Sequence, residues 1–71
     1  MPMIPDDPIQ DYRVDIHTGS KQTGIHHFES TESQASDTAR RIVASLGGDH
    51  GDVYVSNGVG GATYYDTVAV Q

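Results

Sequence analysis

The 71-residue chain is large enough for one domain, and its formal net charge of -6 disfavours binding to nucleic-acid phosphates and to anionic membranes. It has no cysteine, which excludes disulfides and thiolate metal sites and fits a reducing compartment such as the cytoplasm. No apolar run approaches the roughly 20 residues that a membrane-spanning helix requires. A domain this small buries only about 60% of its unfolded surface, so we expect a second subunit to add stability and the protein to be a homo-oligomer.

The first ten residues form the first predicted segment. They contain Pro2, Pro5 and Pro8, spaced three residues apart. Proline at this period favours an extended, polyproline-like conformation rather than a helix or a central strand. We therefore expect an extended N-terminal arm over residues 1–10, followed by a single domain over residues 11–71.

A hairpin is predicted next. Residues 11–18 alternate apolar and polar side chains, as a half-buried strand does. Residues 19–24 form a polar turn flanked by glycines, and residues 25–30 form the return strand. If Phe28 faces the core, alternation places His27 on the opposite face.

The strongest local pattern is an apolar stripe with the spacing i, i+4, i+7, i+8, i+11, which predicts a helix. The stripe consists of Ala35, Ala39, Ile42, Val43 and Leu46. Thr31 and Gln34 fit a capping box at its start, and Gly47 and Gly48 provide a left-handed stop. We expect the whole stripe, including Leu46, to be buried.

A second hairpin follows the helix. Residues 53–56 and 62–70 have the character of strands, and Asn57-Gly58 tolerates the positive φ that a tight turn between them requires. Regular alternation along the last strand places Tyr65 away from the core and Asp66 toward it. The position of Asp66 requires either a hydrogen bond or a bulge that changes the register.

These elements predict an α+β fold: a four-stranded, mainly antiparallel sheet (β-β-α-β-β) with one helix packed on one face. Across the sheet, the expected order is the second strand, the first, the third and then the fourth. One helix cannot cover both faces of four strands, so the other face meets solvent, a subunit or a ligand. Tyrosine, histidine and arginine are enriched at recognition surfaces. The predicted binding residues on this face are Arg13, His17, His27, Tyr54 and Tyr65.

Other kinds of site have weaker support. His26 and His27 are neighbours on a strand and should point to opposite faces, so they cannot easily share one ion, and we expect no metal and no cofactor. Asp15 beside His17 would suit a general base and its orienting carboxylate, but no serine lies in a nucleophile-elbow motif. The glycines of residues 57–61 lack the lysine and the helix of a phosphate-binding loop.

We therefore predict a non-catalytic binding protein that acts as a homo-oligomer through an open sheet face or a strand edge. Its expected partners are itself and another protein or a small ligand, and its size and acidity are in keeping with an accessory protein of a phage or mobile element. One alternative is an acidic inhibitor that occupies the basic groove of a nucleic-acid enzyme. The other is a small metal- or ligand-dependent enzyme.

Overall fold

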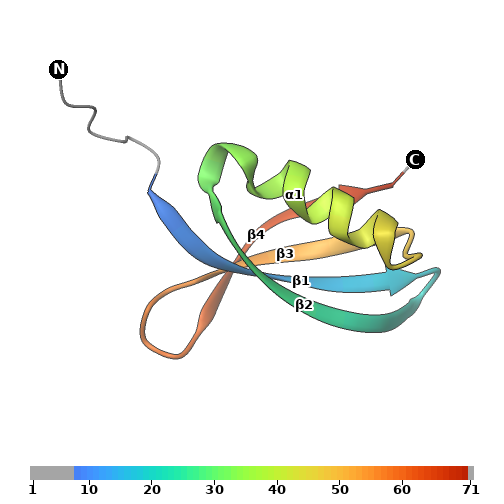
Figure 1. The fold of residues 1–71 in the computed structure, drawn as a ribbon. Helices are drawn as coiled ribbons and strands as arrows, with labels where there is room; N and C mark the ends of the chain where they lie inside the picture. The colour runs from blue at the N-terminus through green and yellow to red at the C-terminus, as the bar shows by residue number, and fades with distance from the viewer. Residues whose placement is uncertain (1–7, 71) are drawn as a thin grey trace, which may run out of the picture.

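The structure is a computed structural model and describes residues 8–70. Four strands and one helix follow each other in the order that the sequence predicts (Figure 1). The elements are β1 (Ile9–Thr18), β2 (Lys21–Thr31), α1 (Glu32–Ser45), β3 (His50–Ser56) and β4 (Ala62–Ala69). The predicted α+β fold is confirmed. No helix in the described part of the chain is long and apolar enough to cross a membrane.

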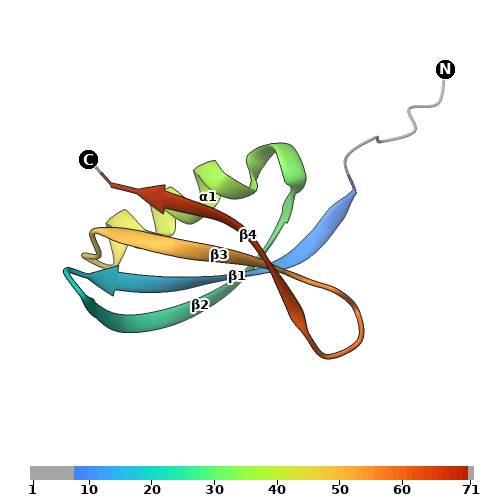
Figure 2. The same cartoon turned by 180° about the vertical axis from the view of Figure 1, so that it is seen from behind.

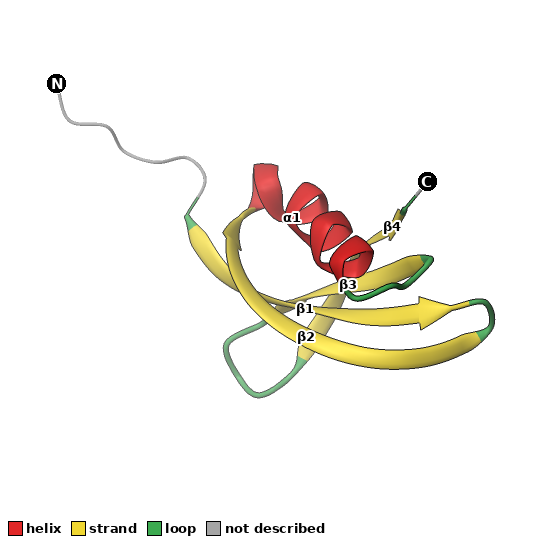
Figure 3. Cartoon of the chain, turned by 45° about the vertical axis from the view of Figure 1, so that its right-hand side comes forward, coloured by secondary structure: helices red, strands yellow, loops and turns green. Residues whose placement is uncertain are grey.

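The four strands form one sheet in the order β2-β1-β3-β4, as predicted, and all three neighbouring pairs are antiparallel. Helix α1 lies across one face of this sheet (Figure 3). The views from the front and from behind agree that the loop between β3 and β4 extends to the other side, away from α1 (Figures 1 and 2).

The core fills the space between the sheet and the helix. Tyrosine, valine and isoleucine side chains from the strands meet small side chains of α1, which let the helix approach the sheet closely. The buried residues are Tyr12, Val14, Ile16, Ala35, Ala39, Val43, Val53 and Val68. The helical stripe predicted from the sequence therefore forms the core contact of α1 through Ala35, Ala39 and Val43.

The first hairpin is tighter than predicted. Thr18 pairs with Lys21, so the turn consists of two residues, with Gly19 at φ 63°. The carboxylate of Asp49 fixes this turn, because its Oδ2 accepts a hydrogen bond of 2.7 Å from the Gly19 amide. β1 also begins at Ile9, inside the predicted arm, and the arm residues 1–7 lie outside the described residues.

The end of α1 corrects the prediction that Leu46 is buried. Leu46 is the C-cap residue and its side chain is 58% exposed. The chain leaves the helical path there, since Gly47 has φ 80° and the Gly48 amide bonds back to the carbonyl of Val43 at 2.9 Å. Gly48 then passes so close to β1 that an added Cβ would lie 2.5 Å from Ile16 Cγ2. Backbone rather than a leucine side chain covers this corner of the core.

The predicted capping box at the start of α1 is also wrong. Thr31 is the N-cap residue, but its side chain makes no capping hydrogen bond to the helix. Its hydroxyl lies instead 3.4 Å from the hydroxyl of Ser33. Glu32 still places a carboxylate in the first turn, where it interacts favourably with the helix dipole.

Candidate functional site

The face of the sheet opposite α1, which we refer to as the open face, carries the polar side chains of all four strands. Alternation along the strands and the observed register place them there. They include Asp11, Arg13, Asp15, His17, His27, Glu29, His50, Asp52, Tyr54, Tyr64 and Thr67.

Arg13 is held at the centre of the open face by a carboxylate and an aromatic ring. Its Nε lies 2.9 Å from Asp15 Oδ1 without hydrogen-bond alignment, so the contact is an ion pair, and its Nη2 donates a long bond of 3.5 Å to Oδ2. The guanidinium carbon also lies 4.5 Å from the centroid of the Tyr54 ring, in cation–π distance. Tyr64 meets the Tyr54 ring edge to face, with centroids 5.9 Å apart. The arginine is thereby fixed in place and still about one third exposed.

A second network connects β4 to β1 through Asp52. Thr67 Oγ1 donates to Asp52 Oδ1 at 2.9 Å, so it can accept the hydroxyl proton of Tyr64, whose oxygen lies 2.6 Å away. The other oxygen of Asp52 lies 3.4 Å from His17 Nε2. His17 in turn stacks on His50 with ring centroids 4.9 Å apart. Polar contacts thus run without interruption from Tyr64 to the histidine pair.

The histidines do not converge on one point. The His17 and His50 rings are parallel to within 4°, so their nitrogens lie side by side rather than around a common centre. His26 pairs with Val14 and His27 with Arg13, on opposite faces, as alternation predicts. Among residues 8–70, no group of three or more histidine or carboxylate side chains could hold a metal ion.

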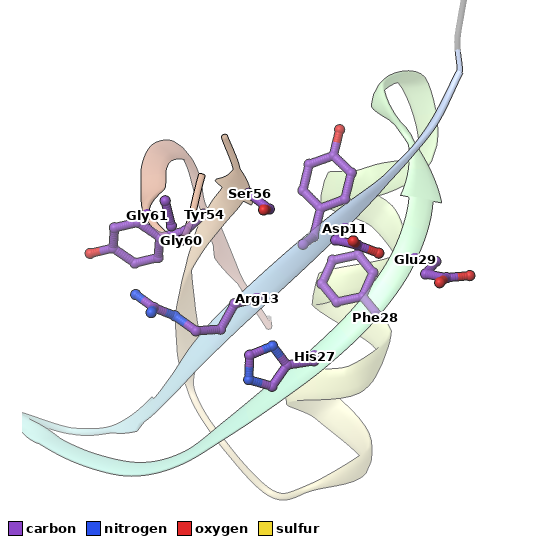
Figure 4. Close-up of a pocket in the computed structure, with 11 residues that line it drawn as sticks. Asp11, Arg13, His27, Phe28, Glu29, Tyr54, Ser56, Gly60 and Gly61 are labelled. Atoms are coloured by element: carbon purple, nitrogen blue, oxygen red, sulfur yellow. The ribbon is translucent and has the colours of Figure 1, made fainter. Parts of the chain in front are cut away.

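An open groove of about 820 Å³ occupies one end of this face (Figure 4). Arg13, His27 and Tyr54 line it, and the loop between β3 and β4 closes one side through Gly60 and Gly61. Asn57 orders this loop, since its Oδ1 accepts the amides of Val59 and Gly61 at 2.9 and 3.1 Å. Those amides donate within the turn, so they are not free to bind a phosphate.

Two carboxylates at the groove oppose each other. Asp11 and Glu29 are direct cross-strand partners on β1 and β2, and both are exposed. Like charges directly opposite in a sheet repel each other. In the described part of the chain, no lysine, arginine or histidine forms an ion pair with either of them. Within residues 8–70, this pair therefore has no counter-charge.

Tyr65 is the one predicted site residue that does not lie on the open face, so its placement there was wrong. Val53 pairs with Asp66 and Tyr54 with Tyr64, which makes Tyr65 the extra residue of a β-bulge. Its ring packs edge-on against Tyr12 at 5.6 Å and its hydroxyl donates to the carbonyl of Glu32 at 3.0 Å. Tyr64 takes its place on the open face. In the sequence, the sign of this bulge was that regular alternation placed the charged Asp66 on the core face.

Both solutions proposed for Asp66 occur together. The bulge shifts the register, and Asp66 remains on the helix side, where Oδ2 accepts a hydrogen bond of 2.6 Å from the hydroxyl of Ser36. The other predicted residues, Arg13, His17, His27 and Tyr54, lie on the open face as expected, although His17 lies outside the groove.

Neither a family model, nor a curated protein, nor a solved structure matches the chain. The chemistry of the site therefore has to be derived from its geometry. The groove offers a fixed guanidinium, aromatic rings, an imidazole and two carboxylates, which suit the recognition of a polar or charged surface. Ser56 also lines the groove, and its hydroxyl accepts the amide of Gly58 rather than contacting a histidine.

Proposed function

We propose that the chain is a non-catalytic binding protein of the cytoplasm that works as a homo-oligomer and holds another protein on its open face. The observation that carries this proposal is the cluster of Arg13, Tyr54 and Tyr64 on the open face, in which Arg13 and Tyr54 line the groove. Arginine and tyrosine anchor interfaces because they combine a large contact area with directed hydrogen bonds. Here their mutual contacts limit their motion before a partner arrives, which lowers the entropy lost on binding.

The polar contacts of the open face support binding over catalysis. A nucleophile activated by a base requires the two side chains within hydrogen-bond distance, with a third group that orients the base. Asp52 does hold His17, but the other neighbour of His17 is the stacked ring of His50. The groove is also open to water, whereas catalysis gains from exclusion of water.

The alternative of an acidic inhibitor has less support. Asp15 is paired with Arg13, which compensates its charge, and Asp52 is already engaged by His17 and by the hydroxyl of Thr67. An inhibitor of a nucleic-acid enzyme needs a wide field of carboxylates that imitates phosphates. At the groove, the carboxylates without an ion-pair partner form a single pair at its edge, which is not such a field.

Tyr54→Ala tests the proposal, because it removes the ring on which Arg13 rests. Tagged wild-type protein and the variant would be used to capture partners from the native host, followed by mass spectrometry. Arg40→Ala, on the exposed side of α1, is the matched control for tag and handling. We expect a partner that both the wild type and Arg40→Ala capture to bind Tyr54→Ala more weakly. The expected loss is about 1–3 kcal/mol in binding free energy. Equal capture by both variants would exclude the open face.

A further inference from the structure

The outer edge of β2 lacks most of the usual protection over residues 24–31. Natural edges are blunted by bulges, prolines, lysines or short length, because an exposed ladder of amides and carbonyls pairs with other strands. Over residues 24–31, β2 pairs regularly with β1 and contains no proline and no lysine. The bulge of β2 lies outside this segment, at Thr23, and the opposite edge, β4, carries its own bulge at Tyr65.

We propose that a second copy of the chain pairs antiparallel with this edge, around a two-fold axis at Phe28. Each His27 then faces Glu29 of the partner subunit, and the two four-stranded sheets become one sheet of eight strands. This inference rests on the proposed homo-oligomer and gives it a contact surface along the edge of β2, next to the groove.

Symmetry restricts the possible registers. A two-fold axis perpendicular to the sheet keeps each side chain on its own face, so residues that face each other must be an even number apart, and one residue faces its own copy. With Glu29 on the axis, the two carboxylates would oppose each other. With His27 on the axis, Ile25 would face Glu29 of the partner subunit. Neither register forms a favourable cross-strand pair of charges.

The register with Phe28 on the axis gives favourable pairs at the axis, at positions 27 and 29, and at positions 25 and 31. It places two aromatic rings together at the axis and a β-branched pair, Ile25 and Thr31 of the partner subunit, at each end. It also creates the pair of His27 with Glu29 of the partner subunit twice. Aromatic, β-branched and opposite-charge pairs are those that stabilise antiparallel strands. Phe28 is only partly buried in the single chain, so the contact would cover more of its ring.

Charge complementarity across the sheet supports the same register. Arg13 and His27 are cross-strand neighbours, and so are Asp11 and Glu29. The axis at Phe28 places the row of Arg13 and His27 in line with the carboxylate row of the partner subunit. The imidazole then lies beside Glu29 of the partner subunit, which has no ion-pair partner within the described residues, and Asp11 follows as the next carboxylate in that row.

The positions of exposed apolar side chains also support the register with Phe28 on the axis. Ile9 is 70% exposed and faces Thr31 across the β1–β2 pair, and Ile25 is 54% exposed. In the proposed register, Ile25 of the partner subunit lies on the other side of Thr31, which extends the row that begins at Ile9. A row of β-branched side chains then crosses the subunit boundary at each end of the contact. The groove of each subunit lies beside the contact, because Phe28 and Glu29 also line it.

Disulfide trapping tests the register directly, because the chain has no native cysteine. His27→Cys and Glu29→Cys would be prepared separately, one of them isotope-labelled, mixed and oxidised at micromolar concentration. Side chains opposite each other across antiparallel strands have Cβ atoms about 4.5–5.5 Å apart, close to the spacing of a disulfide. We expect the mixed dimer, with one labelled and one unlabelled chain, to exceed both homodimers.

Other outcomes would overturn the inference in distinguishable ways. Self-crosslinking of His27→Cys would place the axis at His27. Absence of crosslinks in a protein that sediments as a dimer would place the contact elsewhere and leave the homo-oligomer intact. A monomer at all concentrations would contradict both the contact and the proposed homo-oligomer.

Glu29→Gln provides a second measurement with a matched control. It removes the carboxylate from two cross-strand imidazole–carboxylate pairs of the dimer, and Ala44→Lys changes the net charge equally on the exposed last turn of α1. We expect Glu29→Gln to raise the dimer dissociation constant by about 2- to 30-fold, the range for two such pairs, and Ala44→Lys to leave it unchanged. Equal dissociation constants for the two variants would refute the register. Capture of the partner by the Tyr54→Ala variant is a separate measurement and tests the open face without changing Glu29.

Discussion

Gly51→Ala tests how closely α1 approaches the sheet. An added Cβ at Gly51 would lie 2.6 Å from Val14 Cγ2 and 2.8 Å from Val43 Cγ2, and both valines are fully buried. Carbon atoms in contact prefer about 3.5–4.0 Å, so both valines would have to move. Inserting a methyl group into a packed core costs about 1–3 kcal/mol. The loss of glycine flexibility in the unfolded chain offsets about 0.4–1 kcal/mol of that cost.

Gly24→Ala is the matched control, because Gly24 also lies in a strand but has only Ile16 Cδ1 near its hypothetical Cβ, at 3.9 Å. We expect Gly24→Ala to stabilise the fold by about 0.4–1 kcal/mol and Gly51→Ala to be about 1–3 kcal/mol less stable than this control. Urea unfolding followed by circular dichroism, at one protein concentration, measures both values.

A double variant locates the source of the cost. Val43→Ala removes one of the two methyl-bearing side chains that the new Cβ would meet, so Gly51→Ala combined with Val43→Ala should cost less than the sum of the single changes. Contacting residues usually show coupling of about 0.5–3 kcal/mol. Equal stability of Gly51→Ala and Gly24→Ala, or strict additivity with Val43→Ala, would show that the helix lies further from β3 than described.

Three further predictions concern other parts of the fold. Ser36→Ala should destabilise by about 1–2 kcal/mol in urea unfolding, because it removes a short hydrogen bond to the partly buried carboxylate of Asp66, and an unchanged midpoint would mean that this bond is not formed. Leu46→Ala should change the free energy of unfolding by less than about 0.5 kcal/mol, since the side chain is exposed, and a loss of several kcal/mol would restore the prediction from the sequence. Thermal melts with and without a chelator should coincide, because no described group of side chains could hold a metal ion, and a lower melting temperature on chelation that zinc reverses would reveal one.

The sequence was most informative where one periodicity extended over many residues. The spacing of Ala35, Ala39 and Val43 identified the helix and its buried face. The alternation of Tyr12, Val14 and Ile16 identified the strand that lies beneath it. Together these patterns predicted that one face of the sheet would be left without a helix.

The errors lie where the backbone departs from a regular repeat. Leu46 continues the helical stripe in the sequence, but the chain has already left the helix at that position, so periodicity no longer determines its direction. One extra residue in β4 exchanged the faces of Tyr64 and Tyr65. A bulge depends on the partner strand as well as on the bulged one, so a single strand read in isolation cannot locate it.

The contacts that define the site could not be predicted without the register between the strands. Asp52, Thr67 and Tyr64 come from β3 and β4, and only the pairing of these strands brings the three side chains together. The same holds for Asp11 and Glu29, which are far apart in the sequence and become direct neighbours through the first hairpin. Composition and alternation predict which face such residues occupy, but not which of them meet.

The strand order also determines how the chain can fold. Each hairpin pairs neighbours in the sequence, whereas the central β1–β3 ladder, in which Val14 faces Val53, closes a loop that contains β2 and α1. The entropy of closing this loop is lost before its contacts form, so we expect docking of two early hairpins to limit the folding rate. Substitutions in either hairpin turn should then slow refolding with little change in the unfolding rate, because the hairpins are already formed in the transition state, while substitutions at Val14 or Val53 should change both rates.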